Sequence, residues 1–352
     1  MQILITNIEM DAYNGTTLYV KDLALGLVRR GVSVEVFTLR LGKVSREIAD
    51  AGVVVTTKLG ELSKPDLIHG HQNIVTRLAL NKFKLTPCIS WIHDRLSPLD
   101  IPLFHKNIVQ YAAVDYNCAE RYIQDYSISS ADIKVVYNWV NLERFEKKKI
   151  WSATLNTALV FSNYANNHNY LKLIKQACEI KGVNLQVIGK GVGKERPKPE
   201  QLIGGFDLVF GKAKAAMESM AVGCAVIVCD FTGLAGMVKP QNFEHYRKYN
   251  FGMKLMTRPT TVETLCEELD KFSTRDSQIV CDRIREDASL EKSIDLLINL
   301  YQDAILRHKR GLRNKYSETL KHTLLIWKKT IRIWLSIWTE LNYPKIYKAL
   351  KG

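Results

Sequence analysis

The sequence has no pattern that would build a metal centre or a disulfide framework. Its seven cysteines are odd in number, and no C-x-x-C pair or histidine pair stands at metal-ligand spacing. We therefore expect reduced thiols in a cytoplasmic protein, with no metal and no cofactor. The scattered positions are Cys88, Cys118, Cys178, Cys224, Cys229, Cys266 and Cys281.

Long apolar runs and a secretory leader are also missing. No uninterrupted apolar stretch approaches the ~18 residues that a membrane-spanning helix needs. The first residues read as a short strand over residues 3–6 instead of a signal peptide. A length of 352 residues with 46% hydrophobic residues suggests two globular domains.

Acidic residues are scarce only near the carboxyl end. Residues 307–352 hold 12 Lys and Arg against 2 Glu, a net charge of +10, which leaves +4 of the total +14 for residues 1–306. Within this basic region apolar residues recur at helical spacing, and polar residues fall largely opposite. The apolar stripe is Leu324, Trp327, Ile331, Trp334, Leu335, Trp338 and Leu341, and the polar residues include Lys321, Lys328, Lys329 and Arg332.

Such a helix is typical of an interfacial membrane anchor, with tryptophan at the headgroups and lysine near anionic lipid. It is also consistent with a stripe that packs on the protein body or on a second subunit of a homodimer. Nucleic acid is a poor partner, because the aromatic side chains face away from the charges. The candidate membrane or oligomer residues are Trp327, Trp334, Trp338, Lys328, Lys329 and Arg332.

The most informative stretch is residues 206–230, which read as strand, glycine turn, helix, glycine and strand. Gly211 and Lys212 lead into the helix, where backbone N–H groups and the helix dipole favour phosphate. Glu218, two turns later, is placed to accept hydrogen bonds from sugar or ribose hydroxyls. The stretch therefore indicates a nucleotide-sugar site, although an ordinary βαβ crossover has the same spacing.

These residues resemble the donor-binding strand and helix of GT-B glycosyltransferases of the retaining "glycosyl transferases group 1", or family 4-like, type. That family has a helix ending Glu-Ala-Met-Ala-x-Gly-x-Pro-Val-Ile, and residues 218–227 read ESMAVGCAVI. The family's first glutamate falls on Phe210, so the chain resembles a bacterial subgroup that lacks this acid. The resemblance implies a nucleotide-diphosphate sugar as substrate and metal-independent transfer with retention of configuration.

Two loops of the same region complete the expected donor site. Most relatives carry an Arg and a Lys in the loop at residues 162–169, where this chain reads SNYANNHN. The loop at residues 189–194, GKGVGK, follows a predicted strand and offers backbone for close approach to a nucleotide. A flexible surface loop is the alternative, and the RPKP run at residues 196–199 supports it. The donor-binding residues implied are Gly15, Asn163, Gly189, Lys190, Gly211, Lys212 and Glu218.

Histidines follow two predicted strands of the first half. Residues 66–71, DLIHGH, and 91–94, WIHD, resemble strand ends of the same family, and such ends are where open α/β sheets place ligands. His93 and Asp94 are the candidate catalytic residues, since a histidine near neutral pH can orient a hydroxyl. A hydrogen-bonded structural histidine fits the same positions, and Asn14-Gly15 fits both a donor loop and a simple turn with a helix cap.

The predicted fold class is α/β of the GT-B type, with two Rossmann-like domains facing across a cleft plus C-terminal basic amphipathic helices. The predicted domains are an acceptor domain at 1–148, a nucleotide-sugar domain at 149–290 and a helical extension at 291–352. The predicted function is sugar transfer to a glycan or lipid-linked acceptor in bacterial surface polysaccharide assembly, at the inner face of the cytoplasmic membrane. A non-catalytic sugar- or partner-binding module and a nucleotide-sugar epimerase are the alternatives.

Overall fold

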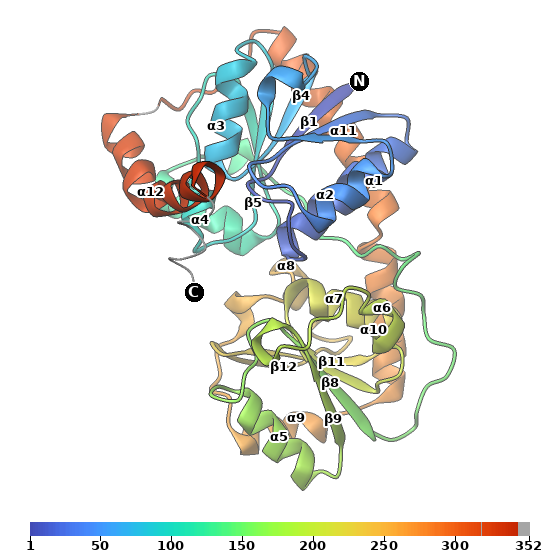
Figure 1. Cartoon of the computed structure of the whole chain (residues 1–352). Coiled ribbons are helices and arrows are strands. Elements are labelled where there is room, and N and C mark those ends of the chain that lie inside the picture. Colours follow the sequence, from blue (N-terminus) through green and yellow to red (C-terminus); the bar gives the residue numbers. More distant parts are fainter. Residues whose placement is uncertain (318, 344–352) are drawn as a thin grey trace. The chain divides into compact units, whose positions relative to one another are not determined.

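A computed structural model describes residues 1–317 and 319–343. They form two compact units, each built on its own sheet. The first unit takes Met1–Val114, Cys118–Val136 and the described residues from Ile294 onward, and the second takes Asp115–Asn117 and Tyr137–Ser293. Both are α/β structures, which confirms the predicted fold class (Figure 1).

The first unit has a seven-stranded parallel sheet in the order β3-β2-β1-β4-β5-β6-β7. Strands β4 and β5 are buried along their whole length, as expected for parallel strands covered on both faces. The strands are β1 (Gln2–Thr6), β2 (Ser33–Phe37), β3 (Val54–Thr56), β4 (Leu67–His71), β5 (Cys88–Ile92), β6 (Ile108–Ala113) and β7 (Ile133–Val135). The helices are α1 (Gly15–Arg29), α2 (Lys43–Ala49), α3 (Asn73–Lys82), α4 (Tyr116–Tyr126), α11 (Leu290–Lys309) and α12 (Leu320–Asn342), of which α4 and α11 begin with residues of the second unit.

The second unit has a five-stranded sheet in the order β12-β11-β10-β8-β9. Alternate residues of β10 point to opposite faces: Val209 joins a core cluster with α7 and α10, whereas Leu208 and Phe210 join one with α5 and α9. The strands are β8 (Thr157–Phe161), β9 (Asn184–Ile188), β10 (Leu208–Gly211), β11 (Ala225–Asp230) and β12 (Gly233–Met237). The helices are α5 (Leu171–Ile180), α6 (Glu200–Ile203), α7 (Ala213–Val222), α8 (Phe243–Lys248), α9 (Val262–Leu269) and α10 (Thr274–Asp287).

The glycines Gly233 and Gly236 are compatible by sequence with a loop that approaches a ligand, but they lie in strand β12. It is an edge strand antiparallel to β11, with a register shift between Val228 and Cys229. Gly233 has a φ of 152°, and a Cβ there would lie 2.8 Å from the carbonyl oxygen of Arg258. The glycine therefore permits a close strand contact. None of the described helices is both long and apolar enough to cross a membrane.

Candidate functional site

The second sheet has a topological switch point between β8 and β10. From β8 the chain moves to one side to form β9, and then returns to the other side to form β10 and β11 (Figure 1). In open α/β sheets, ligands bind at the carboxyl ends of the strands beside such a point. The segments that follow these ends are residues 162–169 after β8, 189–194 after β9 and Lys212 after β10.

Lys212 lies at this edge, directly after β10 and directly before α7. Its ammonium forms an ion pair with Asp230, the last residue of β11, whose side chain is only 1% exposed. The exposed rings of Tyr164 and Phe231 also contact this ammonium, with their centroids 5.1 and 5.5 Å from Nζ. The predicted phosphate-binding lysine is therefore held by an acid and two aromatic rings.

The backbone that enters α7 is strained. Ala213, its first residue, has a left-handed φ of 49°, and its N–H donates to the carbonyl oxygen of Phe251 at 2.9 Å. Asn250 and Phe251 are left-handed too, with φ of 47° and 53°. Each such non-glycine residue costs about 1–3 kcal/mol, and these residues cluster at ligand sites. The strain therefore marks the same edge as Lys212, at a helix end that favours anions.

Glu218 and Phe210 occupy the two positions where the family pattern has acids. Glu218 is 5% exposed, and one of its oxygens lies 3.9 Å from Nζ of Lys214, one turn earlier on α7. Phe210 is 1% exposed and belongs to the core packed by α5 and α9. The single acid of this helix is therefore buried beside a lysine, and the other position is part of the hydrophobic core.

The structure brings Asn163, Gly189 and Lys190 together. The side-chain oxygen of Asn163 accepts from the backbone N–H of Lys190 at 3.1 Å, and its carbonyl oxygen accepts from that of Gly191. Gly189 has a φ of 138°, and a Cβ there would lie 2.0 Å from the carbonyl oxygen of Ser162. The glycine-lysine loop is thus fastened to the loop after β8, and Lys190 remains exposed.

In the first unit, His69, His71 and His93 meet at the carboxyl ends of β4 and β5. Nδ1 of His71 and Nε2 of His93 lie 2.7 Å apart, and Nδ1 of His69 lies 2.5 Å from the hydroxyl of Tyr301 on α11. His69 stacks on Trp91 with a centroid distance of 4.2 Å, and the ring of Tyr19 lies edge-on to His93 at 4.6 Å. Among the described residues, no group of His, Cys, Asp and Glu side chains is placed to hold a metal ion.

Burial keeps the three imidazoles neutral. It lowers the pKa of His69 and His71 well below 6.5, with further lowering from the neighbouring imidazoles, and it lowers the pKa of His93 to about 3. Nε2 of His71 is buried and has no hydrogen-bond partner among the described residues. Because a buried N–H without an acceptor is rarer than a buried lone pair, we assign the proton of His71 to Nδ1. Nε2 of His93 then accepts, and its Nδ1–H remains a donor.

Two further predicted residues, Asp94 directly after His93 and Gly15 at the start of α1, do not complete this cluster. The carboxylate of Asp94 accepts from the backbone N–H groups of Leu96 and Ser97, at 2.6 and 3.1 Å, and so shapes its own loop. The described partner of the His93 ring is His71 and not Asp94. Gly15 begins α1, where Asn14 forms a capping box, and a Cβ at Gly15 would meet nothing within 4 Å. No close packing therefore requires a glycine there.

The predicted helix in the basic region is present as α12. The side chains of Trp327, Trp334, Trp338, Lys328, Lys329 and Arg332 are all exposed. The face that packs on the first unit carries His322, Ile326, Thr330 and Ile337, which are buried. The three tryptophans of the stripe therefore lie largely at the surface, and the ring of Trp338 also contacts that of Tyr343, with centroids 5.4 Å apart. Leu341 also belongs to the predicted stripe, but the position of its side chain is outside the described part.

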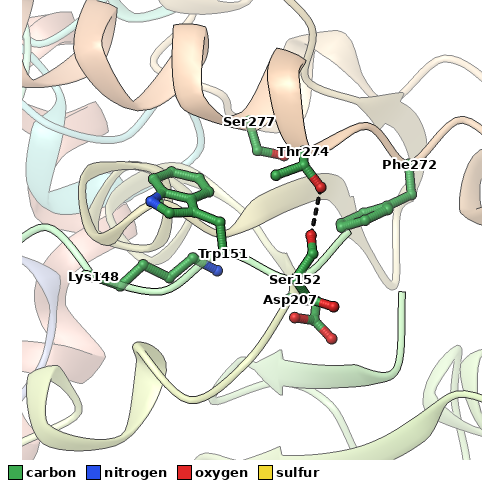
Figure 2. Close-up of a pocket in the computed structure, with 8 residues that line it drawn as sticks. Lys148, Trp151, Ser152, Asp207, Phe272, Thr274 and Ser277 are labelled. Carbon is green, nitrogen blue, oxygen red and sulfur yellow. Dashed lines mark hydrogen bonds between the residues drawn. The ribbon is translucent and has the colours of Figure 1, made fainter. Parts of the chain in front are cut away.

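A small hollow at the opposite end of β10 is a packing feature. Figure 2 shows that Trp151, Thr274 and Phe272 surround it, and the hydroxyl of Thr274 donates to the carbonyl oxygen of Ser152 at 2.5 Å. Asp207, before β10, accepts from the backbone N–H of Asn156 and Thr157 at the start of β8. This acid therefore joins two strand beginnings and lies at the amino ends, away from the edge that carries Lys212.

Several residues that contact the predicted site residues were not indicated by any sequence pattern. Tyr19 and Tyr301 come from α1 and α11, far along the chain from the histidines, and no motif marks them. Asp230 had one available signal, since it is an acid placed directly after a fully apolar strand run. Arg247 fits both a ligand contact and an ion pair by its sequence alone, and in the structure it is buried with Nε 2.5 Å from the Asp287 carboxylate.

Comparison with known families gives one sequence match. Residues 13–144 match the model of Glycosyltransferase Family 4. The stretch contains Gly15, His93 and Asp94, but none of the donor-binding residues predicted in the second unit. No match to this sequence was found among curated proteins.

Several solved structures are similar to this protein over most of its length. A glycosyltransferase from Rickettsia africae ESF-5 is similar over 86% of this chain and 98% of its own, with 11% identity and a TM-score of 0.64. Anabaena Alr3699/HepE, solved in complex with UDP and glucose, is similar over 86% and 100%, with 14% identity and a TM-score of 0.62. Sucrose-phosphate synthase from Thermosynechococcus elongatus is similar over 86% and 98%, with 11% identity and a TM-score of 0.58. The chain therefore has the GT-B glycosyltransferase fold, and its residues 13–144 are similar to Glycosyltransferase Family 4.

Proposed function

We propose that this protein is a glycosyltransferase that moves a sugar from a nucleotide-diphosphate sugar to a glycan or lipid-linked acceptor. The observation that carries the proposal is the position of Lys212, beside the amino end of α7 at the switch point of the second sheet. The family match over residues 13–144 and the GT-B fold support the same class of reaction. Because many functions share one fold, the residues at this edge of the second sheet are the specific support for a transferase.

The donor binds the second unit in this proposal. The Lys212 ammonium and the amino end of α7 stabilise the leaving diphosphate. The exposed rings of Tyr164 and Phe231 offer stacking faces for the base, and Glu218 accepts from ribose hydroxyls. Because Asp230 already neutralises Lys212, phosphate binds only by replacing an existing ion pair, and donor affinity is correspondingly lowered.

The acceptor binds the first unit, where His93 contacts the acceptor or the transferred sugar. With the proton of His71 on Nδ1, His93 acts as a neutral hydrogen-bond donor through its own Nδ1–H. We propose transfer with retention and without a metal ion, because residues 206–230 resemble retaining family-4-like enzymes. The proposed setting is bacterial surface polysaccharide assembly at the inner face of the cytoplasmic membrane.

The first test is calorimetric binding of UDP, GDP, dTDP, ADP and CMP to the full chain, with and without a metal chelator. We expect one nucleoside diphosphate to bind in both conditions. Lys212→Gln should weaken that binding about 10- to 100-fold, because one charge-assisted contact is lost. Lys198→Gln, at an exposed lysine of the same unit, is the matched control, and Asp230→Asn should strengthen binding by releasing Lys212.

Each result that contradicts the proposal points to a different alternative. If no nucleotide binds, the donor site is absent and the sugar- or partner-binding module replaces the transferase. If a nucleotide sugar binds and is converted to an isomer without an acceptor, the protein is an epimerase. If Lys212→Gln and Lys198→Gln bind alike, the donor site lies elsewhere.

A further inference from the structure

Helix α12 is fixed to the first unit by one face only. The ring of His322 lies 2.8 Å from the carbonyl oxygen of Pro102 and contacts the ring of Phe104 at a centroid distance of 4.4 Å. Near the other end of α12, Glu340 forms an ion pair with Arg40. Contacts near both ends fix the helix to the unit, so its remaining faces have a defined orientation.

One of these faces is apolar and exposed. Trp327 is 62% exposed, and Trp334 and Trp338 are stacked with centroids 6.4 Å apart while remaining more than 40% exposed. Single exposed apolar side chains are ordinary, but a run along about five helical turns indicates a contact surface. We call this face the tryptophan arc, and its residues are Leu320, Leu324, Trp327, Trp334, Leu335 and Trp338.

The face beside it is positively charged. At helical spacing it lies between the tryptophan arc and the side that packs on the unit. The only acid of α12 is Glu340, which Arg40 already pairs. We call this face the basic arc, and its exposed residues are Lys321, Lys328, Lys329 and Arg332.

We propose that α12 docks the protein on an anionic lipid surface. Trp and Leu side chains of the tryptophan arc enter the headgroup region, and the basic arc contacts lipid phosphates. Tryptophan suits this depth, because its ring is apolar and its N–H still finds a polar partner. A second copy of the chain is a poorer occupant, since apposed α12 helices would bring two basic arcs together without an acid to pair them.

Helix α12 also lies against the segment that follows His93. Pro102, whose carbonyl oxygen contacts the His322 ring, is nine residues after His93. Between them, the Arg121 guanidinium donates to the carbonyl oxygens of Asp94 and Ser97 at 2.9 Å each, and Leu96 is 70% exposed. If the proposed transferase function holds, this arrangement keeps the acceptor side of the first unit near the membrane, as a lipid-linked acceptor requires.

The test is co-sedimentation of the full chain with phosphatidylcholine vesicles, with and without phosphatidylglycerol. We expect binding only to the anionic vesicles. Replacing Trp327, Trp334 and Trp338 together by Ser should reduce it to the background level. Replacing Leu41, Leu78 and Leu85 by Ser, at exposed leucines elsewhere on the first unit, is the matched control and should change nothing.

A second variant separates the two arcs. Lys328→Gln, Lys329→Gln and Arg332→Gln together should weaken partitioning about 100-fold at low salt, since each basic residue contributes about fivefold. The effect should shrink as salt screens the charges. Circular dichroism should show unchanged folding for all variants, because every substituted side chain is exposed.

Two outcomes would overturn the proposal. Equal sedimentation of the wild type and the tryptophan variant would show that the arc does not meet lipid. Light scattering that detects a dimer in the wild type and a monomer in the tryptophan variant, with vesicle binding unchanged, would assign the arc to a second copy. Both measurements omit nucleotide, so their failure is separate from failure of the proposed transferase activity.

Discussion

The carboxyl-terminal edges of the two sheets both collect side chains that follow parallel strands, but they carry different chemistry. In the first unit, His69, His71 and His93 are neutral and packed among aromatic rings. In the second, Lys212 and Asp230 form an ion pair beside left-handed backbone. A parallel sheet fixes where side chains from separate loops converge, whereas desolvation and the neighbouring groups decide whether they carry charge there.

The largest expected effect is a loss of stability of the second unit when a charge is placed in its core, next to the carboxyl-terminal edge of its sheet. Phe210→Glu would supply the acid that the family pattern has, but inside the core packed by α5 and α9. Losing the phenyl ring costs about 3–5 kcal/mol, and the unpaired carboxylate adds a desolvation penalty. We expect the second unit to lose its cooperative urea transition.

The matched control is Phe231→Glu, because Phe231 is 55% exposed at the same edge. It should move the urea midpoint of the second unit by little. An unchanged midpoint for Phe210→Glu would contradict this account, since it would mean that the core offers a partner for a second carboxylate.

The next effect is a pH dependence of the first unit alone. Because burial lowers the pKa of the three histidines, the unfolded chain binds protons below about pH 6.5 that the folded unit does not bind. Stability therefore stays level above that pH and falls below it, by about 1.4 kcal/mol per pH unit for each histidine. Asp100 acts in the opposite sense, because burial raises its pKa to about 7. As the pH falls below 7, the folded unit binds this proton before the unfolded chain does, which stabilises the folded unit.

Urea unfolding between pH 5 and 8 checks this balance, to which His308 adds in the same sense as the three histidines because burial lowers its pKa too. His69→Phe should reduce the slope by about one proton, whereas His168→Asn, at an exposed histidine of the second unit, should leave it unchanged. A first unit that grows more stable as the pH falls from 6.5 would show that the imidazoles are charged in the folded state.

The smallest expected effect is a change in turnover that leaves nucleotide binding unchanged. His71→Phe removes the donor to His93 and should lower turnover about tenfold, the value of one hydrogen bond. Nucleotide affinity should stay unchanged, because the donor site belongs to the second unit. His71→Asn, whose amide N–H can replace the Nδ1–H donor, should restore most of the turnover; equal loss in both variants would assign His71 a packing role only.

The strand ends that carry the candidate residues could be predicted from the sequence, because apolar runs and glycine turns are local signals. Residues 206–230 fold as β10, α7 and β11 as expected, and α12 spans the predicted amphipathic stretch. The partners could not be predicted in this way. Tyr301 meets His69 across 232 positions of the chain, and nothing in the sequence around Lys212 shows that Asp230 pairs with it.

The sequence by itself determined the α/β class and the location of glycine turns, basic helix and histidine-bearing strand ends. The physical reason is that periodicity and helix termination depend on residues within a few turns of each other. Only the tertiary structure decided that the histidines are neutral, that Asp230 neutralises Lys212, and that the tryptophan arc of α12 faces outward. These properties depend on contacts and water exclusion between segments that are distant in the chain, and no local pattern records them.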